Sequence, residues 1–447
     1  MLKSDLMAIL HRLLLGLTGI SVLLSACGFP ANPGKPTAAP HISRPSPVAP
    51  TASPLAPTVT PALAIPVPAP AGSFKTGNYR NLFQEYLGKS DVEVQARLEA
   101  AWQQLFYGDN DSQRVYYPVG ADMAYIEDIG NNDVRTEGMS YGMMIALQLD
   151  KKPEFDRLWK WANTYMYQVG GPYKGYFAWH CSTDGNQLDA NPASDGEEWF
   201  VTALFLASGR WGNGQGIYDY RQQAQAILDT MRTKTAENNG IATDMFNPQA
   251  KQVVFVPAGR NSTFSDPSYQ LPAYYELWAR WADKDNQFWT DAASTSRLFF
   301  QKAADPHTGL MPDYANFDGT PATTDDHKDF RFDAWRTLSN VAVDYAWFGL
   351  DPWQAERSDQ VLKFLASQGM DSYPNQYSLS GKPLSGDHST GLVAMAAVAA
   401  MAATPEIGKP FVQALWDEQI PSGTWRYYDG MLYMLGLLHV SGKFHAK

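Results

Sequence analysis

The sequence contains only two cysteines, Cys27 and Cys181, among its 447 residues. Two cysteines are too few for the disulfide framework of a small secreted scaffold. Because Cys27 lies in a segment that we expect to carry lipid, Cys181 has no cysteine left to pair with, and no intrachain disulfide is expected. We interpret Cys181 as a small buried hydrophobic residue rather than as a nucleophile.

Motifs for cofactors and metals are also missing. The glycine-rich segment 212–216 lacks the lysine and the strand–helix context of a phosphate-binding loop. The acidic segment 325–327 (Asp-Asp-His) has no helical histidine pair or thiolates to complete a metal site, so a solvated turn is the better interpretation. No serine-centred nucleophile elbow is visible. We therefore expect no cofactor and no metal.

Positive charge is in short supply as well. The chain has 35 lysines and arginines against 46 aspartates and glutamates, which gives a formal net charge of −11. Nucleic acids are bound mainly by clustered lysine and arginine side chains. The composition therefore argues against nucleic acid as a partner.

The hydrophobic run near the amino terminus is too short to span a membrane. Residues 13–24 cover about half the length that a bilayer requires, and basic residues precede them, as in a signal peptide. The run ends in LSAC (residues 24–27), which is typical of a lipobox. We predict that residues 1–27 form a lipoprotein signal and that lipid on Cys27 attaches the protein to the cell membrane or cell surface. The alternative is an ordinary signal peptide with an incidental cysteine.

A change in composition follows at residue 28. Residues 28–72 hold 13 of the 30 prolines, no acidic residue and one aromatic residue. Such a segment cannot bury enough apolar surface to form a core, so we predict a disordered, semi-rigid spacer. All 14 tryptophans lie in residues 73–447, which are long enough for a large core and are predicted to form the catalytic domain.

Helical patterns recur through residues 73–447, without the alternation of strands and helices that is typical of a parallel sheet. Ser90 and Glu93 form a capping-box pattern ahead of apolar residues at three-to-four spacing. Further helices are predicted at Met139–Leu149, Phe155–Met166, Glu197–Ala207, Tyr218–Met231, Ser268–Trp281, Ala292–Ala303, Ala334–Phe348, Pro352–Ser367, Gly391–Ala402, Pro405–Glu418 and Tyr428–His439. This pattern favours an all-α helical toroid, although a generic helical bundle has the same periodicity.

Glu137 is the first of three acidic residues with unusual neighbours. It opens an apolar, glycine-containing helix, EGMSYGMM. Apolar surroundings penalise the charged form of a carboxyl group and can raise its pKa toward neutrality, as a general acid requires. The alternative is a helix amino-terminal charge that the macrodipole favours, which would promote ionisation instead.

Asp195 and Asp333 are the other two. Asp195 lies in SDGEEW, where an N-cap and first-turn acids are the more common explanation for such residues. Asp333 lies in FRFDAWR, between aromatic residues and beside Arg331 and Arg336. Arginine neighbours favour an ionised carboxylate, which a general base needs, but a structural ion pair would give the same pattern.

Aromatic residues supply a second indication. Four of them, including Trp179, fall in the glycine-rich segment 171–186. Flat rings suit the apolar faces of pyranose sugars. We expect more than half of the tryptophans to lie in the core instead.

At these stretches the sequence closely resembles glycoside hydrolase family 8. The resemblance covers nearly all of Tyr79–Gly442 and rests on segments that follow the family's order: EGMSYGMM, YFAWHC, NPASDGEEWF, SGRWGNG, DPSYQLPAYYELWA, PDYANFDG and FRFDAWR. Within the family the chain looks most like the exo-oligoxylanases that release xylose from the reducing end. The resemblance implies an (α/α)6 barrel, in agreement with the helix count, and an inverting mechanism.

Carried over by motif, the resemblance implies roles for single residues. Glu137 matches the general acid and Asp333 the general base, with the two carboxyl groups roughly 6.5–9.5 Å apart to admit a water. Asp195 matches the acid that helps to hold and distort the sugar at the cleavage point. Tyr269, in DPSY, is expected to help orient the attacking water.

The same resemblance implies a set of substrate contacts. Trp179 and Trp199 lie in matching segments and are expected to be sugar platforms, and Arg336 is expected to contact the substrate. The loop 381–388 (GKPLSGDH) resembles the oligoxylanase segment that closes one end of the cleft. In that match His388 binds the reducing-end xylose.

Together these features predict an exported, lipid-anchored, monomeric enzyme that acts on xylo-oligosaccharides or a related β-glycan. The lipobox departs from the pattern of such oligoxylanases, which often lack a signal. Two alternatives stay open. One is an endo-acting β-glycanase of the same family, such as a xylanase, endoglucanase, licheninase or chitosanase. The other is a surface lipoprotein that binds sugars without cutting them.

Overall fold

The structure is a computed structural model that describes residues 72–323 and 327–446. The predicted signal peptide, the lipobox at Cys27 and nearly all of the predicted spacer lie outside these ranges. No helix within the described ranges is long and apolar enough to cross a membrane.

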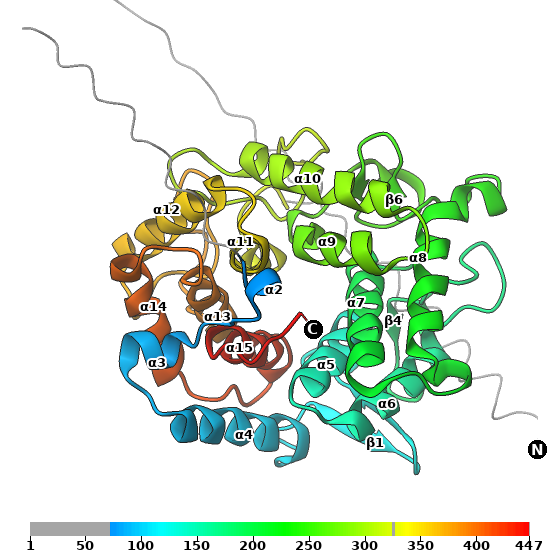
Figure 1. The fold of residues 1–447 in the computed structure, drawn as a ribbon, viewed down its shortest axis with the longest axis horizontal. Helices are drawn as coiled ribbons and strands as arrows, with labels where there is room; N and C mark the ends of the chain where they lie inside the picture. Colours follow the sequence, from blue (N-terminus) through cyan, green and yellow to red (C-terminus); the bar gives the residue numbers. More distant parts are fainter. Residues whose placement is uncertain (1–71, 324–326, 447) are drawn as a thin grey trace, which may run out of the picture. The chain divides into compact units, whose positions relative to one another are not determined.

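Among the described residues, six helices contact one another in a closed circuit and form an inner ring (Figure 1). One of these inner helices, α13 (Thr390–Ala399), exposes almost none of its apolar residues and is therefore buried on most sides. The other five are α5 (Thr136–Gln148), α7 (Ser194–Trp211), α9 (Pro272–Trp281), α11 (Arg336–Phe348) and α15 (Arg426–Val440).

An outer layer of helices packs against this ring, and each outer helix precedes an inner one in the chain (Figure 1). The outer helices are amphipathic and bury one face each. They are α4 (Asp91–Tyr107), α6 (Lys152–Trp161), α8 (Tyr220–Glu237), α10 (Asn286–Ala303), α12 (Trp353–Ser367) and α14 (Pro405–Asp417), with the short helices α2 (Ser73–Thr76) and α3 (Leu82–Leu87) ahead of them. This mostly helical arrangement is consistent with an (α/α)6 barrel.

Local signals explain where several helices begin. The predicted capping box at the start of α4 is confirmed, because Ser90 accepts a hydrogen bond from the Glu93 N–H while the Glu93 side chain accepts one from the Ser90 N–H. The predicted helix Ser268–Trp281 is divided instead: a 3₁₀ turn at Pro267–Tyr269 precedes α9, which starts at Pro272. Proline disfavours helical conformation in the residue before it, so the helix starts there.

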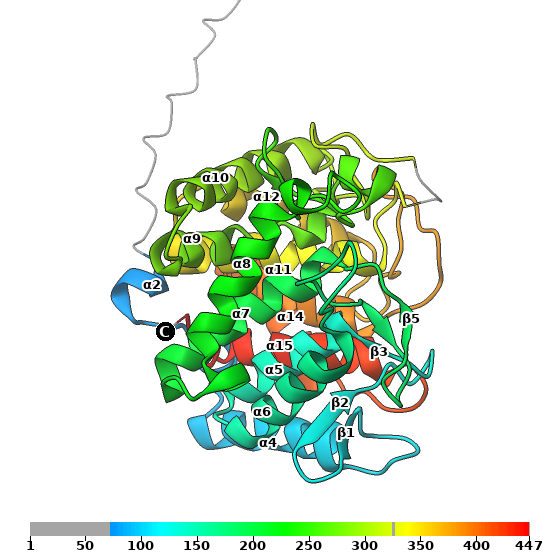
Figure 2. The same cartoon turned by 90° about the vertical axis from the view of Figure 1, so that its right-hand side faces the viewer.

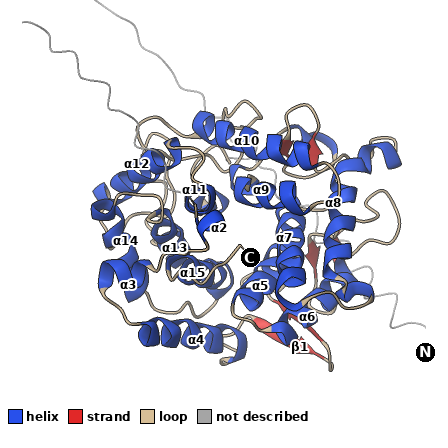
Figure 3. Cartoon of the chain, in the orientation of Figure 1, coloured by secondary structure: helices blue, strands red, loops and turns tan. Residues whose placement is uncertain are grey.

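Short strands form three small antiparallel sheets, which the sequence did not predict (Figure 3). β3 leads directly into α5 and pairs with β4. β4 contains the buried Cys181. Among the described residues Cys181 has no cysteine partner. The strands are β1 (Tyr116–Val119), β2 (Met123–Ile126), β3 (Val134–Arg135), β4 (His180–Cys181), β5 (Gln187–Asp189), β6 (Phe246–Asn247) and β7 (Gln252–Val253).

Tryptophan fills much of the core between the two layers of helices. The expectation that most tryptophans are buried is confirmed. The buried ones are Trp102, Trp159, Trp161, Trp199, Trp278, Trp289, Trp335 and Trp347. Large buried rings contribute strongly to the hydrophobic stabilisation of a domain.

Candidate active site

The amino-terminal ends of the inner helices gather the predicted site residues at one end of the ring. Glu137 and Asp195 lie in the first turns of α5 and α7. Tyr269 and Asp333 lie in 3₁₀ turns that precede α9 and α11, and His388 lies just ahead of α13. Figure 2 shows this end at the right, where β3 and β5 lie, with the carboxyl terminus at the other side.

Arg336 connects the acidic residues of three helices. Its Nη1 donates hydrogen bonds to Glu137 Oε2 at 3.0 Å and to Asp195 Oδ2 at 3.1 Å. The same nitrogen donates to the Tyr141 hydroxyl at 2.5 Å. Nη2 lies 2.9 Å from Asp333 Oδ1. Because the Arg336 side chain is only 6% exposed, these contacts hold the three carboxyl groups around one buried cation.

This arrangement limits the distance between Glu137 and Asp333. The oxygens that contact Arg336 are at most about 8 Å apart, because Nη1 and Nη2 belong to one rigid, planar guanidinium. Inverting glycosidases have carboxyl groups separated by about 6.5–9.5 Å. The structure therefore brings the predicted acid and base close enough to act on one sugar.

Glu137 has the environment that a general acid needs. Burial raises the pKa of its carboxyl group to about 7, and the negative charges of Asp333 and Asp195 add to this effect, whereas Arg336 opposes it. The Tyr427 hydroxyl donates a hydrogen bond to Glu137 Oε1 at 2.9 Å. Glu137 thus lies in a helical first turn, as the structural alternative proposed, but its carboxyl group is not held ionised by that position.

Asp195 faces Arg336 and does not cap its helix. The N-cap of α7 is Ala193, and no side chain caps this end. Asp195 Oδ1 accepts the Gly196 N–H at 2.9 Å, and burial raises the pKa of its carboxyl group. The neighbouring Glu197 and Glu198 point into the core instead, where they bond the Phe177 N–H and the Tyr275 hydroxyl.

Asp333 is the most accessible of the three carboxylates, with 30% of its side chain exposed. The structural interpretation of the FRFDAWR segment is confirmed, since Asp333 forms an ion pair with Arg336, whereas the role of Asp333 as a general base stays a prediction. The Tyr428 hydroxyl donates to Asp333 Oδ1 at 3.4 Å. Phe332, directly before it, has a φ of +28°, which is strained for a residue with a side chain.

Tyr269 and Trp179 also border this cluster. The ring of Tyr269 lies 5.6 Å from the Arg336 guanidinium carbon, and the carboxylates of Asp195 and Asp333 raise the pKa of its hydroxyl in addition to burial. Trp179 is partly exposed and packs under the Arg135 guanidinium at the start of α5. Trp199 is 8% exposed, and its ring contacts Tyr141 and Tyr274 edge-on. Platform roles for both tryptophans stay predictions.

His388 lies at the end of the loop 381–388, which the sequence analysis identified as a candidate for closing one end of the cleft. The His388 Nδ1 bonds the Tyr373 carbonyl oxygen at 2.8 Å. The loop is fixed by Asn375, whose Oδ1 accepts from the Ser385 hydroxyl at 2.5 Å and whose carbonyl accepts the Trp335 indole N–H at 2.8 Å. Within the described residues, no hydrogen bond or ion pair joins His388 to Arg336 or its carboxylates.

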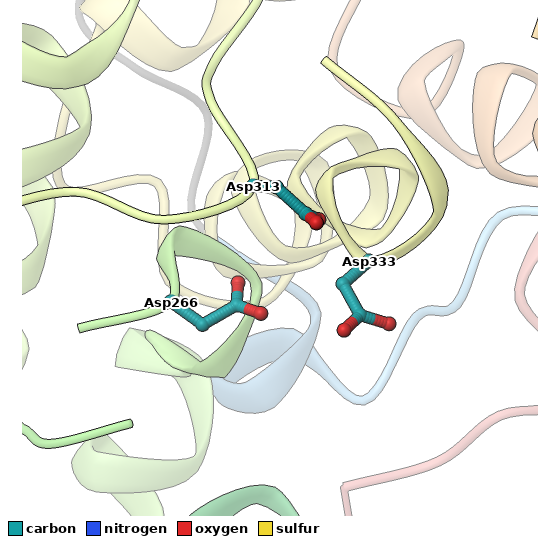
Figure 4. A group of neighbouring side chains, drawn as sticks. All are labelled: Asp266, Asp313 and Asp333. Carbon is teal, nitrogen blue, oxygen red and sulfur yellow. The ribbon is translucent and has the colours of Figure 1, made fainter. Parts of the chain in front are cut away.

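A cluster of three aspartates has the spacing that could hold a metal ion. Figure 4 shows Asp266, Asp313 and Asp333, whose oxygens lie within 4.8 Å of one another. Carboxylates alone are ligands that Ca²⁺ and Mg²⁺ accept. Arg336 already supplies positive charge to Asp333, however, so we assign no metal to this group. His327, from the discounted acidic segment, contacts Asp313, whereas Asp325 and Asp326 lie outside the described residues.

Comparison with known proteins decides the family. Residues 121–442 match the family described as Glycosyl hydrolases family 8. The chain belongs to glycoside hydrolase family 8. It is therefore a glycosidase, and its mostly helical fold is consistent with that of its family 8 structural neighbours.

Curated family 8 relatives match this chain over almost their whole length. The reducing-end xylose-releasing exo-oligoxylanase Rex8A of Paenibacillus barcinonensis is 46% identical over 381 residues, which cover 84% of this chain and 98% of the relative. A reducing end xylose-releasing exo-oligoxylanase of Halalkalibacterium halodurans is 42% identical, with coverage of 83% and 95%.

A solved family 8 structure is similarly close. The xylobiose complex of a family 8 protein from Teredinibacter turnerae has a TM-score of 0.81 and 49% sequence identity, and the match covers 84% of this chain and 99% of that one. A catalytic mutant of this protein in complex with xylohexaose is called a xylanase.

Several residues of this family 8 site escaped the sequence analysis. Tyr141 lies four positions after Glu137, a helical spacing that places both side chains on one face and could have revealed it. Tyr428 begins a predicted helix and Tyr427 directly precedes it, but neither has a local signal that indicates a role in the site. Asp266 and Asp313 lie in the quoted segments DPSY and PDYANFDG, but isolated aspartates in loops are too common to stand out.

Proposed function

We propose that this family 8 enzyme releases xylose from the reducing end of β-1,4-xylo-oligosaccharides with inversion at the anomeric carbon. The observation that carries the chemistry is the pairing of Glu137 and Asp333 across Arg336. Support for the substrate comes from relatives of nearly full length that are named reducing-end xylose-releasing exo-oligoxylanases.

The chemistry divides between the two carboxyl groups. Glu137, protonated, donates its proton to the glycosidic oxygen as the bond from that oxygen to the anomeric carbon breaks. Asp333, ionised, takes a proton from a water that attacks the anomeric carbon from the opposite face. No covalent intermediate with the enzyme forms, so the product has the inverted configuration.

Two further residues would assist these steps. Asp195, held by Arg336, is suited to bond the sugar hydroxyls at the cleavage point. Tyr269 has its hydroxyl among the acidic residues of the cluster and is suited to orient the attacking water. Both roles concern the transition state more than initial binding, so their loss should lower kcat more than it raises KM.

The loop 381–388 supports an exo mode of action. Its hydrogen bonds to Asn375, and through Asn375 to Trp335, fix it beside the segment that carries Asp333. Because a carbonyl oxygen can only accept a hydrogen bond, Nδ1 of His388 donates to it, and we propose that Nε2 bonds a sugar hydroxyl. We propose that this loop closes the cleft beyond one sugar unit and that His388 binds the reducing-end xylose.

A second candidate is an endo-acting xylanase of the same fold. It is favoured by the Teredinibacter turnerae protein, which is 49% identical over nearly its full length and is called a xylanase in its xylohexaose complex. An open cleft would leave room for sugars on both sides of the cleaved bond.

Digestion of xylotriose and cellotriose, with NMR of the fresh products, tests the proposal. We expect xylotriose to yield xylose from the reducing end and xylobiose in the inverted configuration, with little hydrolysis of cellotriose. Early formation of xylobiose, xylotriose and xylotetraose from xylohexaose, ahead of xylose, would support the endo-acting alternative. Products of retained configuration would contradict the roles of Glu137 and Asp333.

His388→Ala tests the closed-end loop. We expect it to weaken the selection of the reducing end, so that xylobiose and xylotetraose form directly from xylohexaose at early times, while hydrolysis itself continues. His307→Ala, at an exposed position, is the matched control. An unchanged product pattern in His388→Ala would contradict the role of this residue.

We also propose that residues 73–447 form the catalytic domain of an exported lipoprotein. Residues 1–27 would be the signal with its lipobox, and residues 28–72 a spacer that carries the enzyme away from the membrane. The domain would act as a monomer on oligosaccharides outside the cytoplasm.

A further inference from the structure

Two buried carboxyl groups lie beside Asp333 and take no part in the reaction described above. Asp266, before α9, is 0% exposed, and Asp313, between α10 and α11, is 1% exposed. One oxygen from each residue and one from Asp333 lie within 4.8 Å of one another. Figure 4 shows the side chains of Asp266 and Asp313 extending toward the side on which Asp333 lies.

Asp266 has one oxygen with a partner and one without. Its Oδ1 accepts the Ser268 N–H at 2.7 Å. Its Oδ2 is buried and has no hydrogen-bond partner among the described residues. A buried carboxylate oxygen without a donor is unfavourable. A protonated oxygen at this position would instead be a donor, and the carboxylate of Asp333 would be an acceptor.

The charges around Asp266 favour the protonated form. It faces the carboxyl groups of Asp333 and Asp313, the hydroxyl of Tyr269 and a single cation, Arg336. Burial, followed by the two acidic neighbours, raises the pKa of Asp266 well above its usual range, and Arg336 opposes this only in part. Arg336 also contacts the carboxyl groups at the cleavage point, so its charge is shared.

Asp313 is satisfied in a different way. One oxygen accepts the Ala334 N–H at 3.2 Å, and the other contacts His327 Nδ1. Arg331 also faces it and opposes the rise in its pKa that burial causes. Asp313 therefore has a partner for each of its oxygens, whereas Asp266 has one oxygen, Oδ2, without a hydrogen-bond partner among the described residues.

We propose that Asp266 is a positioning residue that keeps its proton and donates a hydrogen bond, directly or through one water, to the carboxylate of Asp333. A separation of up to 4.8 Å is one that a single water can bridge with two hydrogen bonds of normal length. The bond favours the ionised state of Asp333 and fixes its orientation. This inference rests on the proposed function, in which Asp333 is the general base.

Substitution of Asp266 tests the proposal through the pH profile of xylotriose hydrolysis. Asp266→Asn keeps a neutral donor, so we expect kcat to stay within about threefold of the unchanged enzyme. Asp266→Ala removes the donor, and we expect kcat to fall about tenfold or more with little change in KM. The acidic limb of kcat should move to higher pH by about one unit, because Asp333 then ionises less readily.

The direction of that shift separates this proposal from a structural role. If Asp266 were ionised, its removal would relieve repulsion and move the acidic limb to lower pH, which would overturn the proposal. An Asp266→Asn variant as inactive as Asp266→Ala would overturn it as well. Asp266→Leu, which also lacks a donor but is closer to aspartate in size, replaces Asp266→Ala if that variant does not fold. Asp318→Asn, at an exposed position, controls for the substitution itself.

Two further measurements complete the test. Loss of activity in a chelator, with recovery on addition of Ca²⁺, would overturn the proposal by assigning a cation to the three aspartates in Figure 4. Asp333→Asn separates a failure of the proposed base, Asp333, from a failure of the proposed positioning role of Asp266. If it keeps near-native rates, the proposed base fails; if it is inactive while Asp266→Ala is normal, only the role of Asp266 fails.

Discussion

Arg336 is the residue on which the site depends. It contacts carboxyl groups that come from α5, α7 and the turn before α11, and it is almost fully buried. One cation cannot neutralise three carboxylates together with their buried neighbours. Some of these groups must therefore carry protons, and the most buried ones take them first. Glu137 is less exposed than Asp333, 16% against 30%, which supports the proposed roles of Glu137 as the acid and Asp333 as the base.

At this scale the pH dependence of turnover is the first prediction. Burial raises the pKa of Glu137 to about 7. A general acid acts in its protonated form, so activity should fall as the pH rises through about 7. The logarithm of kcat against pH for xylotriose should show this alkaline limb. A profile that stays flat well above pH 7, about two units higher or more, would contradict Glu137 as the acid.

Glu137→Gln tests the same residue directly. An amide cannot transfer the proton, so we expect kcat to fall by about 10²–10⁴-fold with binding of xylo-oligosaccharides retained, as measured by calorimetry. Glu356→Gln, on the exposed face of α12, is the control. Unchanged turnover in Glu137→Gln would favour a different acid, and absence of turnover in the native protein would favour the sugar-binding alternative.

At the scale of helices, the site depends on how closely α5 and α15 approach each other. Gly138 lies next to Glu137, and a Cβ at this position would be 2.5 Å from Tyr427 Cε2 and 2.7 Å from its hydroxyl oxygen. Tyr427 donates to Glu137. The absence of a side chain at residue 138 thus permits the hydrogen bond that positions the predicted acid.

Gly138→Ala should therefore displace Tyr427 and disturb Glu137. We expect a fall in kcat of about tenfold, measured on xylotriose, since a small misplacement of a catalytic group is costly. Gly209→Ala, in α7, is the matched control because no atom lies within 4 Å of its added Cβ. That variant should keep its activity and gain up to about 1 kcal/mol of helix stability. Full activity in Gly138→Ala would show that Tyr427 can move without consequence.

A buried ion network joins four other helices. Arg297 on α10 donates to Asp344 on α11 through two bonds of 2.7 Å and to Glu276 on α9 at 3.0 Å. Gln354 on α12 donates to Asp344 at 2.7 Å. Asp344 is 0% exposed, so its charge depends entirely on these partners.

Arg297→Met should destabilise the protein by about 3–5 kcal/mol, because it leaves the carboxylate of Asp344 buried without a cation, whereas Glu276 keeps its ion pair with Arg280. Thermal or urea denaturation measures this loss. Arg80→Met removes an exposed ion pair with Glu85, whose side chains are 45% and 39% exposed, and should cost about 1 kcal/mol or less. Equal effects of the two substitutions would mean that the network is not a main support of the ring.

Helices and site differ in how far the sequence predicts them. The capping box at Ser90 and the apolar periodicity of α4 act over a few residues, so pattern analysis found that helix with nearly correct bounds. Proline at 272 moved the start of α9, a local effect that could have been anticipated. Glu137 and Arg336, by contrast, are 199 positions apart, and no local pattern indicates that they meet. The resemblance to a family supplied their roles, whereas their pairing and the buried Asp266 required the fold.

On the scale of the whole molecule, the helical rings gather the site residues, and we propose that the amino-terminal segment determines where the enzyme acts. The inner helices present their amino termini at one end, so a substrate meets all of the site residues from one side. An enzyme that trims oligosaccharides outside the cytoplasm would benefit from attachment near a transporter or a partner enzyme. Lipid on Cys27 would provide such attachment without burying the catalytic domain.

Cys27→Ser tests that arrangement. In the native protein, radiolabelled palmitate should be incorporated and the xylotriose activity should sediment with the membranes. In Cys27→Ser, the label should be lost and the activity should leave the membrane fraction, because a single acyl-type anchor accounts for the attachment. The kcat on xylotriose should stay the same, since no residue of the site lies in the lipidated segment. Membrane attachment that persists in the variant would favour an uncleaved signal, and native activity found only in solution would favour ordinary secretion.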